Sequence, residues 1–350
     1  MNDTFKDFLD LLKHLIRFPS VVGAEYPFFR VLQRELEEAG AGVSLYQGIL
    51  VAQGARPGEH YLSAHADRHG LVCTGPNEFQ YAAYVANRRG DLLDNAISEK
   101  MFNTVADRFD GRQVLAYEFL SGMYLGAGTI HHAFMCPYRN NMVFEVGGLN
   151  HVSAGTPVGF QDRLSIENGL MRGQLDNVIS VAALVHLFQL GYQGTAFFTA
   201  QEEAGRSWRF LLEWLNRFEN TTRNLTVLDT SPFHDREAAG QQDVVLRRRD
   251  ANGTFDPQAV ERLETVCREK GVAYSFKDAF VEAQNRQREA QGLSPLSYGS
   301  TELGRIVAAS QGRIQGATLQ IPTTEYHTVN ETASVSSCKA FLEVLKQLAL

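Results

Sequence analysis

Cysteine is scarce in this sequence. The 350 residues contain four cysteines, none of which forms a Cys-x-x-Cys pair: Cys73, Cys136, Cys267 and Cys338. Such spacing argues against a disulfide framework and against a zinc site built from thiolates. Because reduced thiols are typical of the cytoplasm, we predict a cytoplasmic location.

Long apolar runs and excess positive charge are also missing. No stretch of about 18 apolar residues could span a bilayer, and the first residues lack the basic and apolar segments of a signal peptide. Lysine and arginine number 33 against 40 acidic residues, for a formal net charge of −7. This balance argues against nucleic acid or a membrane as a partner. The single basic cluster, Arg247-Arg248-Arg249, is interpreted as a solvated strand end.

The remaining composition is that of an ordinary globular enzyme, with 44% hydrophobic and 21% charged residues. Strand-like apolar segments alternate with helical ones, as where Thr195 to Thr199 precedes a helix from Trp208 to Phe218. This alternation predicts an α/β fold, a mixed sheet flanked by helices.

Residues 70–160 interrupt that alternation. Short β-like segments and many glycines fill this part of the sequence, together with one expected helix from Leu92 to Phe109. Because the α/β rhythm stops and then resumes, we predict an inserted, smaller, mostly β domain.

Polar side chains follow apolar strand-like segments at several points. His65 and Asp67 end the segment Ser63-Ala64-His65-Ala66-Asp67 and, two residues apart, share one face of a strand. The imidazole could ligate a metal while the carboxylate orients its ring. By itself, the pair is more typical of an ordinary polar strand end.

Three further strands repeat the pattern. Glu202-Glu203 follows one, Asp229 ends another, and His327 follows a third. Asp176 opens an apolar helix, where it could equally serve as an N-cap. Ligands collect beyond the carboxyl ends of strands in open α/β sheets, so the combination predicts one shared site.

Charge arithmetic predicts two metal ions at this site. Its members are the neutral His65 and His327 and the anionic Asp176, Glu203 and Asp229. Two divalent cations and one bridging hydroxide would balance the three negative charges. Imidazole and carboxylate ligands suit zinc best, with cobalt or manganese as alternatives. Glu202 is left without a metal, as a general base requires.

In chain order, the motifs H-x-D, D-N, Q-E-E-x-G, D and P-x-x-E-Y-H-x-x-x-E resemble the glutamyl aminopeptidase and tetrahedral aminopeptidase family of dinuclear zinc peptidases. The resemblance is weakest within residues 70–160, where that family inserts its oligomerisation domain. It implies a catalytic domain of residues 1–69 and 161–350, an oligomerisation or substrate-lid domain of residues 70–160, and a homo-oligomer.

The resemblance also implies how the metals are held. One metal would bind His65 and Asp229, the other Glu203 and His327, with Asp176 bridging them and joined to Asn177 by a cis peptide bond. These assignments imply two divalent ions per chain.

For catalysis, the resemblance implies that Asp67 orients His65 and that Glu202 is the general base. Glu202 would take a proton from the metal-bridging water and return it to the leaving amine. The implied activity is removal of the N-terminal residue from short peptides.

The sequence departs from the family after H-x-D, where Arg68-His69 replaces what is more often an acidic and then an apolar residue. Arg68 could alter substrate preference or face outward, and we favour the second. His131 could reach a neighbouring subunit's site, although a surface or core position is favoured.

Two other functions stay open. One is a metal-dependent amidohydrolase on the same scaffold, of the deacylase, dipeptidase or carboxypeptidase type. The other is a non-catalytic scaffold, against which the intact ligand candidates and Glu202 argue.

Overall fold

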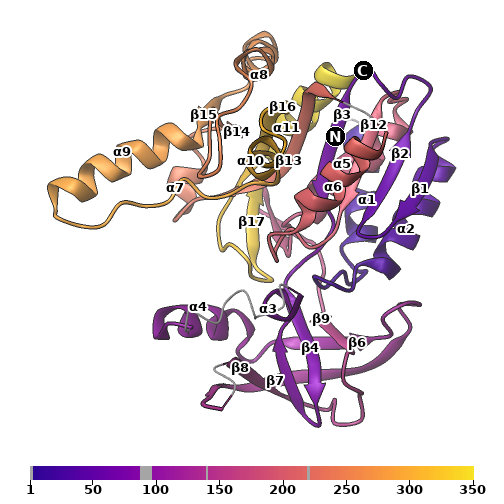
Figure 1. The fold of residues 1–350 in the computed structure, drawn as a ribbon, viewed down its shortest axis with the longest axis vertical. Helices are drawn as coiled ribbons and strands as arrows, with labels where there is room; N and C mark the ends of the chain where they lie inside the picture. The colour runs from indigo at the N-terminus through magenta and orange to yellow at the C-terminus, as the bar shows by residue number, and fades with distance from the viewer. Residues whose placement is uncertain (1–2, 87–96, 139–140, 219–220) are drawn as a thin grey trace.

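The computed structural model describes residues 3–86, 97–138, 141–218 and 221–350. An α/β unit lies above a smaller β-barrel in Figure 1. The fold class predicted from the sequence, a mixed sheet flanked by helices with a smaller β unit, is confirmed. No helix among the described residues is long and apolar enough to cross a membrane.

The α/β unit is organised around an eight-stranded sheet in the order β1-β2-β12-β3-β13-β16-β14-β15. The strands are β1 (Gly42–Tyr46), β2 (Ile49–Gln53), β3 (Tyr61–His65), β12 (Thr195–Thr199), β13 (Thr222–Pro232), β14 (Val244–Leu246), β15 (Tyr274–Phe276) and β16 (Ile314–Thr323). The four adjacent strands β12, β3, β13 and β16 are parallel. Their carboxyl ends therefore meet at one edge, which faces the barrel (Figure 1).

Helices accompany the strands of this α/β unit. They are α1 (Asp3–Leu15), α2 (Tyr26–Glu38), α5 (Val178–Gln189), α6 (Ser207–Arg217), α7 (Arg236–Ala239), α8 (Pro257–Lys270), α9 (Lys277–Ala290), α10 (Glu302–Ala309) and α11 (Val335–Ala349). Helix α5 is predominantly apolar and almost entirely buried, and it packs against the sheet and α1. A separate three-stranded sheet joins β10 (Ser165–Glu167), β11 (Leu170–Gly173) and β17 (Glu331–Ser334).

The barrel closes in the order β4-β5-β8-β7-β6-β9. Its strands are β4 (Gly70–Gly75), β5 (Glu78–Tyr81), β6 (Gln113–Tyr117), β7 (Tyr124–Cys136), β8 (Asn141–Gly147) and β9 (Pro157–Phe160), with helices α3 (Ala82–Ala86) and α4 (Glu99–Phe109). The helix expected from Leu92 to Phe109 begins instead at Glu99, with Ser98 as its N-cap. Residues 92–96 of that expectation lie outside the described residues.

The barrel has a hydrophobic core of its own, which includes Phe79, Phe109 and Phe144. The Tyr117 hydroxyl ties it to the loop between α1 and α2 by accepting from the Val21 amide at 2.9 Å and donating to the Ala24 carbonyl at 3.2 Å. These bonds hold the barrel against the sheet edge that carries the predicted site.

Gly70 marks the point where the chain enters the barrel. A Cβ atom there would lie 2.5 Å from the Val21 side chain and 2.8 Å from the Val158 carbonyl oxygen. Only glycine fits so close an approach, and the passage leaves the preceding residues, Asp67 to His69, at the predicted site.

Candidate metal centre

Four parallel strands deliver the predicted site residues to one edge of the sheet. His65 is the last residue of β3, Glu203 lies in the turn after β12, and His327 lies in the loop after β16. Asp229 differs from expectation, because β13 continues past it to Pro232. It therefore presents its side chain from within a strand.

One cluster of ligand atoms surrounds the His65 imidazole. Its Nε2 atom lies 3.2 Å from Asp176 Oδ1 and 3.5 Å from Asp229 Oδ1. His65 and Asp176 are buried, with 5% and 3% of their side chains exposed. Asp229 keeps 19% of its side chain exposed.

A second cluster adjoins it through Asp176. His327 Nε2 lies 3.5 Å from Asp176 Oδ2 and 3.4 Å from Glu203 Oε2. The two carboxylate oxygens of Asp176 thus face different histidines. The five residues predicted from the sequence to hold metals are brought together in this arrangement.

The geometry of both clusters fits divalent cations. Two ligand atoms bound to one tetrahedral zinc at ~2.0–2.1 Å are about 3.3 Å apart, and the four separations given above run from 3.2 to 3.5 Å. Among the described residues, His327 Nε2, Asp176 Oδ1 and Glu203 Oε1 are buried without a hydrogen-bond partner. Buried polar atoms require partners, and bound cations would provide them.

Asp176 does not act as the N-cap of α5. That position belongs to Asn177, whose side chain donates to the Leu228 carbonyl at 2.9 Å, and no side chain caps the helix. The peptide bond between Asp176 and Asn177 is cis. The Asp176 side chain faces the two histidines rather than the helix.

Asp67 is fully buried behind the site. Its carboxylate accepts the backbone N–H groups of Glu202 at 2.9 Å and Glu203 at 3.0 Å. His65 Nδ1 lies 3.2 Å from the Asp67 carbonyl oxygen and 3.6 Å from its Oδ1. Asp67 therefore contacts both the imidazole and the turn that carries the two glutamates.

Glu202 lies beside the clusters without belonging to either. Burial raises the pKa of its carboxyl well above the usual range. The charge of His65 opposes that rise, and the neighbouring anions Glu203 and Asp229 add to it. A carboxylate in such surroundings has an increased affinity for protons.

Two buried glutamates that were not predicted support the site from behind. Glu331 accepts the backbone N–H of Asp176 at 2.7 Å and that of His327 at 2.5 Å. Glu25 accepts the Gln201 N–H at 3.0 Å, next to Glu202. Glu331 stood in the E-Y-H-x-x-x-E motif four residues after His327, but its other partner, Asp176, is remote in sequence. Nothing local identified Glu25.

His69 is a third residue that the sequence did not identify. Its Nε2 atom lies 3.0 Å from Glu203 Oε2, and its ring centroid lies 3.9 Å from that of His327. Burial lowers the pKa of His69 to about 3, and the charge of Arg108 adds to this effect. The imidazole is therefore neutral, as a metal ligand must be.

Two arginine expectations are wrong. Arg68 does not face outward, because its guanidinium is buried and donates to Ser20 Oγ and to the Ile16 carbonyl, each at 3.0 Å. Arg247 is not a solvated strand end, since only 5% of it is exposed and it donates to Gln320 Oε1 at 2.8 Å. His131 is exposed on the surface of the barrel.

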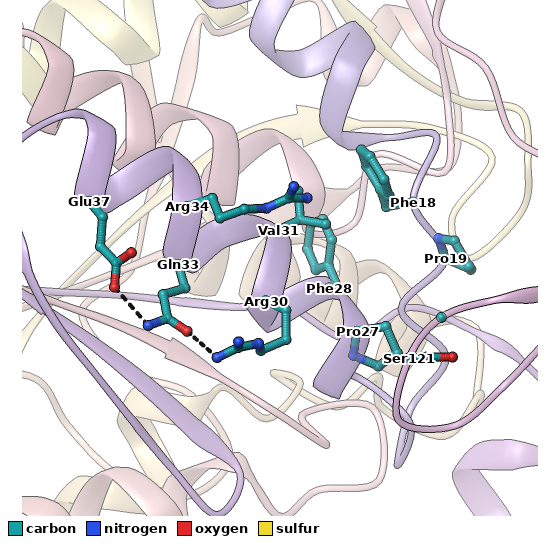
Figure 2. Close-up of a pocket in the computed structure, with 11 residues that line it drawn as sticks. Phe18, Pro19, Pro27, Phe28, Arg30, Val31, Gln33, Arg34, Glu37 and Ser121 are labelled. Carbon is teal, nitrogen blue, oxygen red and sulfur yellow. Dashed lines mark hydrogen bonds between the residues drawn. The ribbon is translucent and has the colours of Figure 1, made fainter.

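A cavity of about 460 Å³ opens beside the second cluster. His69, Glu203 and His327 line it from the sheet edge, and Tyr84 and Arg108 line it from the barrel. A separate cavity of about 410 Å³ lies between α2 and the Ser121–Gly122 turn and contains none of the predicted ligands (Figure 2). Only the first is placed to admit a substrate to the site.

Comparisons with known proteins show the fold. No family model matches the sequence, and no curated protein matches it either. The TET1 peptidase of Pyrococcus horikoshii, described as assembling into a tetrahedron or a large octahedral shell, matches with a TM-score of 0.70 and 17% identity, covering 98% of this chain and 99% of the other.

Two other solved structures also share the fold. An aminopeptidase from the archaeon Desulfurococcus kamchatkensis matches with a TM-score of 0.71 and 14% identity, over 97% of this chain and 94% of the other. A Thermotoga maritima protein described as an endoglucanase matches with a TM-score of 0.64 and 15% identity, over 97% and 96%. The fold is thus shared by proteins with different descriptions, so function must be argued from the site.

Proposed function

We propose that this protein is a metal-dependent aminopeptidase that removes the N-terminal residue of short peptides. The observation that carries the proposal is the position of Asp176 between two clusters, with one carboxylate oxygen facing His65 and the other facing His327. This is the arrangement required of a carboxylate shared by two cations.

In this proposal, each cation has its own ligands. His65 and Asp229 hold one, Glu203 and His327 hold the other, and Asp176 is shared. Zinc suits these ligands best, with cobalt or manganese as alternatives. When bound, the pair would polarise the scissile carbonyl and attract the free α-amine of the substrate.

Glu202 is the proposed proton carrier. Its carboxyl group lies next to the clusters and belongs to neither, so it is free to accept a proton during attack and to return it to the leaving amine. Asp67 positions both Glu202 and His65, because its carboxylate accepts the Glu202 N–H and its carbonyl oxygen contacts His65 Nδ1.

The test is the Glu202→Gln substitution, which keeps the shape of the side chain and removes its basicity. We expect kcat to fall by about 10²–10⁴-fold, with two metals still bound per chain. Glu213→Gln, at an exposed position of α6, is the matched control and should leave kcat unchanged. Equal rates for the two variants would refute the assignment of Glu202.

Substrate panels separate the proposal from its alternatives. An aminopeptidase should cleave peptides with a free N-terminus and leave their N-acetylated forms intact. A deacylase on the same scaffold would show the opposite preference, and a carboxypeptidase would release the last residue. Metal-loaded protein that is inert with all of these substrates would favour a non-catalytic scaffold.

We further propose that residues 70–160 act as an oligomerisation domain inserted into a catalytic domain of residues 1–69 and 161–350. Large apolar side chains are exposed around the connection between β6 and β7: Phe119, Leu120, Met123 and Tyr124. Such patches on soluble proteins mark contact surfaces. Light scattering should show a homo-oligomer for the parent protein and a smaller species for the Leu120→Ser, Met123→Ser double variant. A monomeric parent protein would rule out the proposed oligomerisation domain.

A further inference from the structure

We infer that His69 is a sixth protein ligand of the metal centre and binds the same cation as Glu203 and His327. This inference rests on the proposed metal centre and adds a residue to it. Ligand atoms of these three residues all lie within 4.8 Å of one another, so they converge on one small region.

The separation between His69 and Glu203 is that of two ligands of one ion. His69 Nε2 lies 3.0 Å from Glu203 Oε2, close to the ~3.3 Å expected across a tetrahedral zinc. Nevertheless, His69 Nε2 is buried without a hydrogen-bond partner among the residues that the structure describes. The short distance is therefore not a hydrogen bond of good geometry, and a cation between the two atoms would account for it.

The opposite side of the His69 ring faces a hydroxyl group that suits the tautomer required for ligation. Nδ1 lies 2.5 Å from the Tyr81 hydroxyl oxygen, which also accepts from Arg108 Nη1 at 3.5 Å. An Nδ1–H that donates to this oxygen leaves the lone pair on Nε2 free. Metal-bound histidines characteristically have such a partner on their second nitrogen.

The added ligand makes the two metal positions unequal. Glu203, His327 and His69, with the shared Asp176, supply four protein ligands to one cation, whereas His65, Asp229 and Asp176 supply three to the other. Four ligands complete a tetrahedral zinc site, and three leave a coordination position open. The cation at His69 should therefore bind more tightly than the cation at His65.

The test measures metal binding directly and is independent of catalysis. In a His65→Gln background, which removes a ligand of the other cation, calorimetric titration with zinc should detect one tight site per chain. Adding His69→Gln should weaken that site by roughly 100-fold or more, since even the loss of a partner of a ligand typically costs 10–100-fold. With cobalt in place of zinc, the visible absorption should change on the same substitution, because it reports coordination geometry.

Three further variants separate metal ligation from side-chain packing. His69→Phe fills the same space without a ligand atom and should weaken binding like His69→Gln, whereas His60→Gln, at the opposite end of β3, should not. Tyr81→Phe should weaken binding about 10-fold. Undiminished affinity in both His69 variants would overturn the role of His69 alone. If the parent protein binds no divalent metal, the proposed centre fails as well.

Discussion

The two ends of strand β3 carry the same side chain in opposite electrostatic surroundings. His60 precedes the strand and contacts the Thr226 hydroxyl at 3.3 Å, and burial lowers its pKa to about 4, helped by the charge of Arg262. His65 ends the strand. Burial would lower its pKa too, but the neighbouring carboxylates of Asp176, Asp229 and Asp67 outweigh burial and raise it well above the usual value.

The difference arises from the direction of the strands rather than from the residue. Because four adjacent strands run parallel, their carboxyl ends place acidic side chains around His65, whereas the amino ends place none of these acids near His60. Burying so many like charges is unfavourable unless cations compensate them. The cations proposed for the carboxyl edge would provide this compensation, and the following predictions test the contrast.

The largest effect is expected from replacing the two histidines in turn. His65→Ala removes a ligand and should reduce kcat/KM by about 1,000-fold, or about 4 kcal/mol, with the loss of one metal per chain. His60→Ala should change neither quantity. Elemental analysis and peptide hydrolysis measured on both proteins would decide, and similar losses in the two variants would refute the contrast.

A smaller effect is expected from replacing Glu331, which lies behind the proposed metal ligands. Glu331→Ala removes the acceptor shared by the backbone N–H groups of Asp176 and His327. We expect a 10–100-fold loss of activity or metal affinity, and a smaller loss in Glu331→Gln, which keeps one acceptor. Full activity in the alanine variant would show that the loops hold their positions without Glu331.

Lys277 extends the comparison to a buried cation that lies against aromatic rings. Its ammonium group lies over the Phe233 ring at 3.9 Å and donates to the Pro232 carbonyl, and burial lowers its pKa to about 7. The ordinary pKa of a lysine, 10.5, applies in the unfolded chain. Between pH 7 and 10.5 the unfolded chain therefore binds more protons at Lys277 than the folded protein does, and the free energy of unfolding rises with pH.

Urea denaturation should therefore show the parent protein gaining about 2 kcal/mol of unfolding free energy relative to Lys277→Met between pH 6 and 9. Measurements on metal-free protein avoid competing effects at the site. A difference that stays constant with pH would mean that Lys277 titrates normally.

The smallest effect is expected from His60 itself. Its folded-state pKa of about 4 lies below the ordinary 6.5, so the stability associated with its neutral form is present above pH 6.5 and is lost as pH falls toward 4. Because the ring is half-buried, solvent weakens the effect to about 1 kcal/mol. Metal-free His60→Gln should lose less stability than the parent between pH 7.5 and 4.5, and parallel curves would contradict this.

Much of the site was predictable because each ligand has a local signature. His65, Glu203 and His327 follow apolar strands, and a polar residue at a strand end is visible in a single sequence. Asp176 was ambiguous, since an acid before an apolar helix is equally typical of an N-cap. Only its position between two histidines resolved that ambiguity.

His69, Glu25 and Arg247 could not be predicted in the same way. His69 follows H-x-D as an isolated histidine, and its contacts with Tyr81 and Glu203 join the barrel to the turn after β12. Arg247 was misjudged because three consecutive arginines are usually solvated, whereas the fold buries the first beside Gln320. Contacts between segments so distant in sequence leave no periodic pattern to detect.

The sequence by itself determined the α/β alternation, the interruption at residues 70–160 and the acids and imidazoles that end the strands, since hydrophobic periodicity and strand-end polarity are local properties. The tertiary structure alone decided which atoms face each other. Parallel pairing brought the strand ends to one edge, closure of the barrel brought Tyr81 against His69, and the summed burial of these charges set their proton affinities. Those outcomes depend on distances in space, which a linear pattern does not specify.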